Sequence, residues 1–184
     1  MSALTIRKLT AAEADAKQSE LADVLVDAVA NGASVNFMTG FTHDEALVFW
    51  RGQIDGVASG DRSLLAASDG RSIVGTVIVY FMQQPNQPHR AEIGKMLVHS
   101  SLRRQGLGRR LLEAAEAEAL AAGRTLLMLD TETGSAGDKL YRACGWIEFG
   151  KVPGHAYRPG GKLATTTFFY KNLSETHRAP PARG

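Results

Sequence analysis

The sequence contains a single cysteine, Cys144, among its 184 residues. One cysteine excludes an intramolecular disulfide and any zinc or iron–sulfur site that needs several cysteines. We therefore expect a reducing, cytoplasmic location, with Cys144 packing as a small hydrophobic side chain. His43, His89, His99 and His177 also lack the spacing of metal ligands, so we expect no metal.

The chain also lacks a long hydrophobic segment and a strong excess of charge. Its longest apolar stretch, Ile73 to Met82, contains Gly75 and Thr76 and is far shorter than the roughly 20 residues that cross a bilayer. The first five residues lack the basic start and apolar core of a secretory signal, so we expect none. Lysine and arginine total 21 against 19 acidic residues, a net charge of +2. We therefore expect neither a membrane nor a nucleic acid as partner.

Hydrophobic periodicity predicts an alternation of strands and helices. Strands are expected at 4–9, 63–67, 72–82, 90–98, 125–129, 146–149 and 164–171, and helices at 11–30, 42–54, 107–122 and 135–144. Thr42 and Glu45 have the spacing of a capping box, and Asp69-Gly70 is a strong hairpin signal. The short apolar strand after the third helix predicts a strand–helix–strand crossover between Arg90 and Asp130. These patterns indicate an α+β protein with an α/β-type core.

No internal repeat or linker divides the chain. At this length folding can bury roughly 70% of the surface that the unfolded chain exposes, which is enough for a hydrophobic core that needs no disulfide or metal ion. We expect one domain over residues 1–173. Residues 174–184 include Pro180-Pro181 and no apolar side chain larger than alanine, so they are expected to be disordered.

The most informative segment is Arg103-Arg104-Gln105-Gly106-Leu107-Gly108-Arg109-Arg110, which joins an apolar strand to an amphipathic helix. Glycines at a helix entrance let backbone N–H groups converge on an anion, and the helix dipole adds to the attraction. A phosphate or pyrophosphate is therefore the expected ligand. A dinucleotide-binding fingerprint would need glycine at position 111, which is Leu111, and the chain has no Walker lysine motif.

Two other interpretations of this segment stay open. A Gly-x-Gly can be a tight turn with a solvated arginine face. The arginines could also form a nucleic-acid patch, which would bind DNA or RNA with a strong dependence on salt. Their position around the glycine turn and the near-neutral total charge favour the phosphate of a cofactor.

Together with Leu140-Tyr141 and Gly145-Trp146, the Arg-x-x-Gly-x-Gly motif resembles the acetyl-CoA-binding core of the GNAT acyltransferase superfamily. The segments 31–38, 86–92, 129–135 and 152–154 resemble the tabtoxin-resistance branch, whose members acetylate the amine of a β-lactam amino-acid toxin. The resemblance covers residues 2–173 and implies the GNAT fold, a mixed central sheet of about seven strands flanked by about four helices. Gly134 and Gly137 depart from it, because asparagine and alanine often stand at these places.

The resemblance implies acetyl-CoA as co-substrate. It places the pantetheine arm along the strand that contains Met96, Leu97 and Val98, and the pyrophosphate at the turn. The implied turn contacts are Arg103, Arg104, Gln105, Gly106, Leu107, Gly108 and Arg109, and Ser135 is a further implied cofactor contact. The thioester would lie where the strands that end near Val98 and Asp130 diverge, and an amine would attack its carbonyl directly.

An alkyl amine with a pKa of about 10.4 needs a base to react at neutral pH. Period-two alternation puts Glu92, Gly94 and Met96 on one face of their strand and Leu126, Met128 and Asp130 on one face of the other. Glu92 and Asp130 could therefore converge and are the candidate bases, acting directly or through water. Tyr141 stands where GNAT enzymes often have their proton donor, and a phenol can protonate the departing thiolate.

The resemblance also implies an acceptor pocket between the 33–41 loop, the following helix and the 153–162 loop. Phe37, Trp50, His155 and Tyr157 are the expected acceptor contacts. The implied function is acetylation of a small amine such as a β-lactam amino-acid toxin, which would confer resistance. Another amine, a protein amine, or a non-catalytic acetyl-CoA sensor are the alternatives. We also expect a homodimer, because exposed final strands often pair in such folds.

Overall fold

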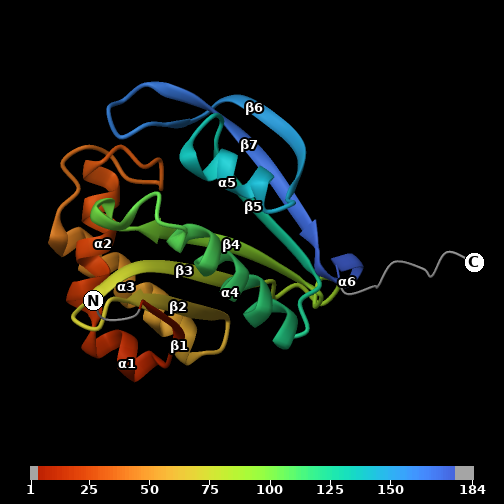
Figure 1. Cartoon of the computed structure of the whole chain (residues 1–184), viewed down its shortest axis with the longest axis horizontal. Helices are drawn as coiled ribbons and strands as arrows, with labels where there is room; N and C mark the ends of the chain where they lie inside the picture. The colour runs from red at the N-terminus through yellow and green to blue at the C-terminus, as the bar shows by residue number, and fades with distance from the viewer. Residues whose placement is uncertain (1–3, 177–184) are drawn as a thin grey trace, which may run out of the picture.

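The structure is a computed structural model that describes residues 4–176, and a seven-stranded sheet runs through it (Figure 1). The strands are β1 (Thr5–Leu9), β2 (Arg62–Ser68), β3 (Ile73–Phe81), β4 (Arg90–Val98), β5 (Leu126–Glu132), β6 (Ile147–Tyr157) and β7 (Leu163–Asn172). The helices are α1 (Ala11–Ala16), α2 (Gln18–Ala30), α3 (His43–Ala58), α4 (Leu107–Ala121), α5 (Ala136–Ala143) and α6 (Leu173–Thr176), with a 3₁₀ turn η1 (Ser100–Leu102). The strand order is β1-β2-β3-β4-β5-β7-β6.

Most predicted elements are confirmed. Thr42 begins α3 with a reciprocal capping box, in which its hydroxyl accepts from the N–H of Glu45 and its own N–H donates to the Glu45 carboxylate. β2 and β3 form the predicted antiparallel pair. β4 and β5 are parallel and are joined through α4, as the crossover pattern predicted. The mixed sheet and its flanking helices agree with the expected fold class.

Several elements differ from the prediction. α3 and β5 continue to Ala58 and Glu132, beyond the expected ends at 54 and 129, and three other differences are larger. The single helix expected at 11–30 is two helices, because the backbone leaves helical geometry at Lys17 (φ −112°, ψ 16°). β6 continues to Tyr157, so half of the expected 153–162 loop is strand and residues 158–162 form the turn to β7. Residues 174–176 of the expected tail belong to α6, and residues 177–184 lie outside the described part of the chain.

The sheet separates two hydrophobic layers. On one face α4 packs its apolar stripe against the sheet, and the buried side chains of this layer include Leu107, Leu111, Leu112, Ile93, Leu127, Leu129 and Phe169. On the other face α2 and α3 pack against the first strands, and this layer includes Leu21, Leu25, Trp50, Leu64, Ile78 and Leu97. Adjacent strand residues alternate between the layers, as the period of two requires.

Within residues 4–176 we find no helix that is both long enough and apolar enough to cross a membrane. The same part of the chain has no group of three or more His, Cys, Asp or Glu side chains arranged to hold a metal ion.

The α4 layer can be tested by removing one fully buried side chain. Leu112 is 0% exposed, so Leu112→Ala should lower the free energy of unfolding by about 2–5 kcal/mol, because it loses apolar burial and leaves a cavity. Leu163→Ala is the control, since that side chain is 54% exposed and its loss should change stability by less than about 0.5 kcal/mol. Urea unfolding measures both. Equal effects of the two substitutions would contradict the assigned core.

Candidate active site

β4 and β5 are hydrogen-bonded only at their beginnings. The parallel pairing joins Arg90, Ala91 and Glu92 to Leu126, Leu127 and Met128, although β4 continues to Val98 and β5 to Glu132. β5 pairs along its whole length with β7 instead, and the two strands diverge (Figure 1). The edge of β4 from Ile93 to Val98 therefore has no strand partner on the β5 side. An extended ligand with amide groups can bond to such an edge.

A β-bulge lies on this free part of β4. The pairing with β3 shifts from Ile78 opposite Gly94 to Thr76 opposite Leu97, so one β3 residue faces both Lys95 and Met96. Lys95 has a positive φ of 46°, and the hydroxyl of Thr76 donates to its carbonyl oxygen at 2.9 Å. The bulge reverses the alternation of side chains beyond it.

The bulge corrects one sequence prediction. Ala91 and Ile93 pack in the α4 layer, so Glu92 faces the α2–α3 side, but Met96 packs against the α4 layer as well. Glu92 and Met96 therefore lie on opposite faces, whereas unbroken alternation put them on one. On β5, Leu127 and Leu129 lie in the α4 layer, so Asp130 faces the same side as Glu92, as predicted.

The turn before α4 has the backbone geometry that the glycine motif indicates. Gly106 is the N-cap residue of the helix with φ 79°, and no side chain caps the first-turn N–H groups. Arg104 also has a positive φ of 61°. A Cβ on Gly108 would lie 3.2 Å from Leu140 Cδ2, so glycine lets α4 approach α5 closely. Uncapped N–H groups at the start of a 15-residue helix suit a phosphate.

The basic and polar side chains around this turn are exposed and weakly held. Arg103 Nε donates to the carbonyl of Val98 at 3.3 Å, and Gln105 donates to the carbonyl of Ser101 at 3.3 Å. Arg109 donates to the carbonyl of Ala143 at 3.3 Å. These residues and the exposed Arg104 give the turn positive charge that can reorient toward an anion. Arg110 differs, because it bonds to the carbonyl of Leu4.

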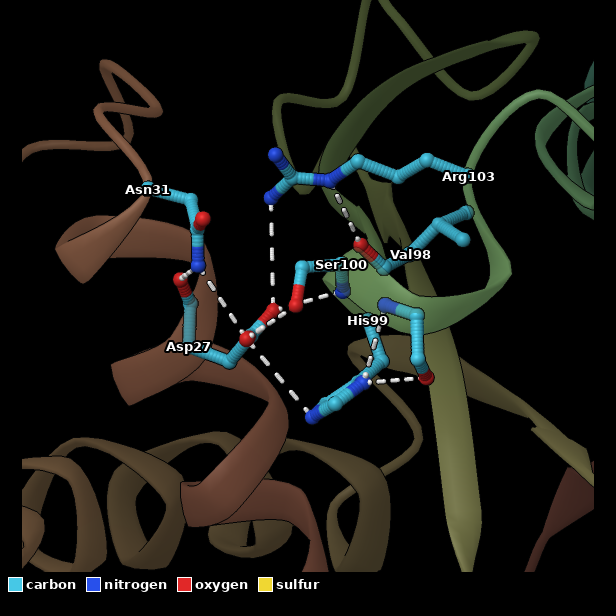
Figure 2. A network of polar contacts seen from close by, with 7 residues as sticks. Asp27, Asn31, Val98, His99, Ser100 and Arg103 are labelled. Atoms are coloured by element: carbon cyan, nitrogen blue, oxygen red, sulfur yellow. Dashed lines mark hydrogen bonds and ion pairs between the residues drawn. The ribbon is translucent and has the colours of Figure 1, made fainter.

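Asp27 on α2 fastens the turn to the rest of the protein (Figure 2). The backbone N–H of Ser100 donates to Asp27 Oδ2 at 2.8 Å, and the Ser100 hydroxyl donates to Oδ1 at 2.7 Å. His99 Nε2 and an Arg103 nitrogen lie 3.6 and 4.0 Å from the same carboxylate, and Asn31 donates to it at 3.1 Å. One half-buried carboxylate therefore positions the segment that links β4 to the glycine turn.

Tyr141 is buried beside the gap between β4 and β5. Its hydroxyl lies 4.0 Å from the sulfur of Met96 on β4, and its ring packs near Trp146 and Phe169. Burial, followed by the negative charge of Asp130, raises the pKa of Tyr141 above its ordinary value. The phenol therefore stays protonated at neutral pH and can act as a hydrogen donor.

The first turn of α5 holds Tyr141 close to β5. Ser135 is the N-cap residue, and its hydroxyl accepts from the N–H of Asp138 and bonds to Thr131. A Cβ on Gly137 would lie 3.0 Å from the Thr131 hydroxyl and 3.4 Å from the Tyr141 ring. The glycine that departs from the family pattern thus allows a close approach of α5 to β5 at this point.

The two candidate bases have different surroundings. Glu92 bonds to Arg90 at 3.0 Å and is 47% exposed. Asp130 is exposed, and its charge acts on both Tyr141 and Lys95. The charge of Asp130 therefore acts on Tyr141 and Lys95, whereas Glu92 is bonded to an arginine.

A groove of about 680 Å³ lies between residues 36–41 and the start of α3. Phe37 lines it, stacks on Phe41 with 4.0 Å between ring centroids, and meets Phe49 edge to face at 5.3 Å. Trp50 is not among the lining residues, because its side chain is 0% exposed in the core. Its neighbour Phe49 lines the groove instead.

The two loops expected to form the acceptor pocket do meet. The N–H and hydroxyl of Thr39 both donate to the carbonyl of Pro159, at 2.9 and 2.8 Å, and Arg158 forms an ion pair with Glu132 at the end of β5. His155 packs edge to face on Phe168 at 5.3 Å, and Tyr157 is 58% exposed. Both lie on β6 near this junction rather than in the groove.

Sequence reasoning missed Asp27, Phe49 and Lys95. Lys95 Nζ lies over the rings of Phe49 and Phe37, 5.3 and 5.8 Å from their centroids. Burial lowers the pKa of Lys95, and the charge of Asp130 opposes this shift. No local sequence motif indicates a role for Asp27 or Lys95. The aromatic pair Phe49-Trp50 is evident in the sequence, but only the structure shows which of the two side chains lines the groove.

Comparisons with known proteins agree with this geometry. The model of the Acetyltransferase (GNAT) family matches residues 27–146. The structure of YncA from Salmonella typhimurium with its cofactor acetyl-CoA is 22% identical, with a TM-score of 0.74 over 99% of this chain and 100% of the other. Ribosomal-protein-alanine N-acetyltransferase from Brucella melitensis is 24% identical, with a TM-score of 0.77 over 92% and 99%. An N-acetyltransferase from Staphylococcus aureus is 18% identical, with a TM-score of 0.77 over 94% and 99%.

The role of Asp27 can be tested by replacing its charge. Asp27→Asn keeps the shape but removes the carboxylate that accepts from Ser100, so the amides of residues 99–106 should exchange with solvent about 10-fold faster or more. Asp23→Asn on the same helix is the control, because the Asp23 side chain is 68% exposed and its carboxylate pairs with His43, away from the turn. Hydrogen–deuterium exchange measures both variants. Unchanged exchange at 99–106 in Asp27→Asn would show that the turn does not depend on this carboxylate.

Proposed function

Because the chain belongs to the GNAT family of acetyltransferases, we propose that it transfers the acetyl group of acetyl-CoA to the amine of a small molecule. The observation that supports this most strongly is the free edge of β4 between Ile93 and Val98, which leads directly to the uncapped start of α4. Acetyl-CoA supplies an acetyl group that is activated as a thioester. Its extended amide chain and its phosphates are the two chemical features that these neighbouring sites accept.

The cofactor contacts follow from this match. The backbone of Met96, Leu97 and Val98 would hold the pantetheine arm, and the segment from Arg103 to Arg109 would bind the pyrophosphate. Ser135, at the start of α5, is the proposed contact on the opposite side of the gap. The uncapped N–H groups of α4 and the exposed Arg103, Arg104 and Arg109 support these assignments, since they supply donors and positive charge without a competing carboxylate cap.

Asp130 and Tyr141 are proposed to move the two protons of the reaction. Asp130, alone or through water, would accept a proton from the acceptor amine, because its charge acts at the gap where Tyr141 and Lys95 also face. Glu92 would assist from the same side of the sheet. Tyr141 would give its proton to the departing thiolate, since burial keeps the phenol protonated and its hydroxyl lies next to Met96 of the proposed pantetheine strand.

The proposed acceptor is a small amine, and a β-lactam amino-acid toxin is the first candidate. Its acetylation in the cytoplasm would confer resistance to the toxin. The aromatic groove of Phe37, Phe41 and Phe49, and the Thr39–Pro159 hydrogen bonds that join its loop to the turn after β6, support a small ligand. His155 and Tyr157 would contribute from β6. The single cysteine, Cys144, supports a reducing compartment.

Release of the CoA thiol tests the function directly. The protein is incubated with acetyl-CoA and, in turn, tabtoxinine-β-lactam, amino acids, aminoglycosides, polyamines and peptides, and free thiol is measured against reactions without acceptor. We expect turnover with a small amine. Binding of acetyl-CoA without thiol release from any acceptor would favour the sensor alternative and contradict the proposal.

The proton-transfer roles predict distinct kinetic defects. Asp130→Asn and Tyr141→Phe should each lower kcat by about 10²–10⁴-fold, because each removes a group that moves a proton in the transition state. The KM for acetyl-CoA should stay within a few-fold of the parental value. Glu92→Gln should have a smaller effect, because Glu92 is bonded to Arg90. Because the pKa of Tyr141 is raised, its phenol should stay protonated, so deprotonation of Tyr141 should cause no loss of activity as the pH rises to about 10.

Tyr170→Phe is the matched control for the tyrosine, because it removes a hydroxyl from β7 outside the gap. It should leave kcat unchanged. A parental rate in Tyr141→Phe would remove its role as proton donor. Parental rates and pH profiles in both carboxylate variants would remove the assignment of the base.

We also propose a homodimer formed through β6. This strand is at the edge of the sheet, and Ile147, Phe149 and Val152 on it are 50%, 52% and 44% exposed. Light scattering should give twice the monomer mass of 19.8 kDa, and Phe149→Lys should shift the protein to the monomer. A wild-type protein that scatters only as the monomer would contradict the dimer.

A further inference from the structure

Lys95 has an unusual place in this fold, because a charged side chain is directed into an aromatic cluster by a bulge in the middle of the site. The bulge holds its backbone at φ 46°, a left-handed conformation that is unfavourable for a residue with a Cβ. The Thr76 hydroxyl fixes the Lys95 carbonyl at 2.9 Å. Without the extra residue, the alternation of β4 would point Lys95 into the apolar α4 layer together with Ile93.

The Lys95 ammonium has aromatic neighbours but no anionic partner in contact. Nζ lies 5.3 and 5.8 Å from the centroids of Phe49 and Phe37. Within residues 4–176, Nζ makes no ion pair or hydrogen bond with another residue. Rings attract a cation but accept no strong hydrogen bond from it. A half-buried ammonium in this situation has donor capacity left for an anion.

The groups around Lys95 restrict where such an anion can come from. Phe37 and Phe49 both line the groove of about 680 Å³. Lys95 is not itself a lining residue, but its ammonium lies over these two rings and is therefore separated from the proposed acceptor pocket only by them. Asp130 is the acidic group whose charge acts on Lys95, and it also acts on Tyr141. The proposed base, the proposed proton donor and Lys95 therefore share one electrostatic environment at the gap between β4 and β5.

A ligand that satisfies this arrangement carries charges of both signs. Its ammonium group would be attracted to Asp130, which is proposed to deprotonate it, and its anionic group to Lys95. A simple amine or a polyamine has no group for Lys95 and would be repelled by it. A free amino acid has an amine and a carboxylate on one carbon. The groove has an aromatic part, lined by Phe37, Phe41 and Phe49, that suits a small or apolar side chain, and Asp44 and Glu45 line it at the start of α3.

We propose that Lys95 is the specificity-determining residue of the acceptor site and binds the carboxylate of a free amino acid whose amine is acetylated. This inference rests on the proposed acetyltransferase function and narrows its substrate class. Lys95 contacts the acceptor and moves no proton. Its loss therefore weakens binding of carboxylate-bearing acceptors and leaves the use of acetyl-CoA intact.

The test compares acceptors that differ only in the carboxylate. Free L-amino acids are each assayed against their own amides, in which the charge is removed, with thiol release as the readout. The wild-type protein should prefer the best amino acid over its amide by about 10-fold or more in kcat/KM. Lys95→Met should raise the KM for that amino acid roughly 10- to 100-fold and leave kcat/KM for the amide and the KM for acetyl-CoA unchanged.

Lys95→Arg and Lys8→Met serve as matched variants. The arginine keeps a cation and should restore part of the preference for the carboxylate. Lys8 pairs with Glu118 on the surface, so its replacement should leave the preference unchanged. Equal use of amino acid and amide by the wild type, an equal loss for both in Lys95→Met, or turnover of polyamines with no amino acid used would each overturn the proposal.

Direct binding separates this proposal from the proposed function. If no acceptor releases thiol, the acetyltransferase proposal fails, and isothermal titration of the same amino acids then decides the role of Lys95. Binding by the wild type that Lys95→Met weakens at least about 10-fold supports the carboxylate site. No binding of any amino acid, or the same affinity in both proteins, overturns it.

Discussion

β4 and β5 share only three residue pairs before they separate, and the whole site depends on this divergence. β5 is held along its full length by β7, and β4 is held by β3, so neither strand can close the gap by moving toward the other. The fold therefore keeps an unpaired strand edge inside a sheet, where it is protected from the aggregation that a free outer edge invites. Tyr141, Asp130, Lys95 and the glycine turn all lie around this opening.

The surroundings of the gap are fixed by contacts that the sequence supplies from distant segments. Asp27 on α2 fastens the residues after β4, Thr76 on β3 fixes the bulge, and Gly137 lets α5 approach β5. These contacts fix the positions of the bulge, the glycine turn and α5 around the gap. Preorganisation of this kind lowers the cost of ordering the site when substrates bind.

Much of the architecture could be predicted from local sequence because the signals are local. The capping box at Thr42, the hairpin at Asp69-Gly70 and the glycine turn each depend on residues within a few positions. The bulge at Lys95 could not be predicted, since it follows from the pairing of β4 with β3 and leaves no mark in the strand itself. The bulge places Met96 on the α4 side of the sheet and directs the Lys95 side chain toward Phe37 and Phe49. The choice of Phe49 over Trp50 likewise depended on tertiary packing.

The proposed function requires that the gap between β4 and β5, with the turn at its end, binds acetyl-CoA. A crystal structure of the protein with CoA bound tests this most directly. We expect the pantetheine arm to be hydrogen-bonded to the β4 backbone between Ile93 and Val98, and the pyrophosphate to accept from the N–H groups of residues 103–109. CoA bound elsewhere, or a gap closed by protein side chains with the turn empty, would contradict it.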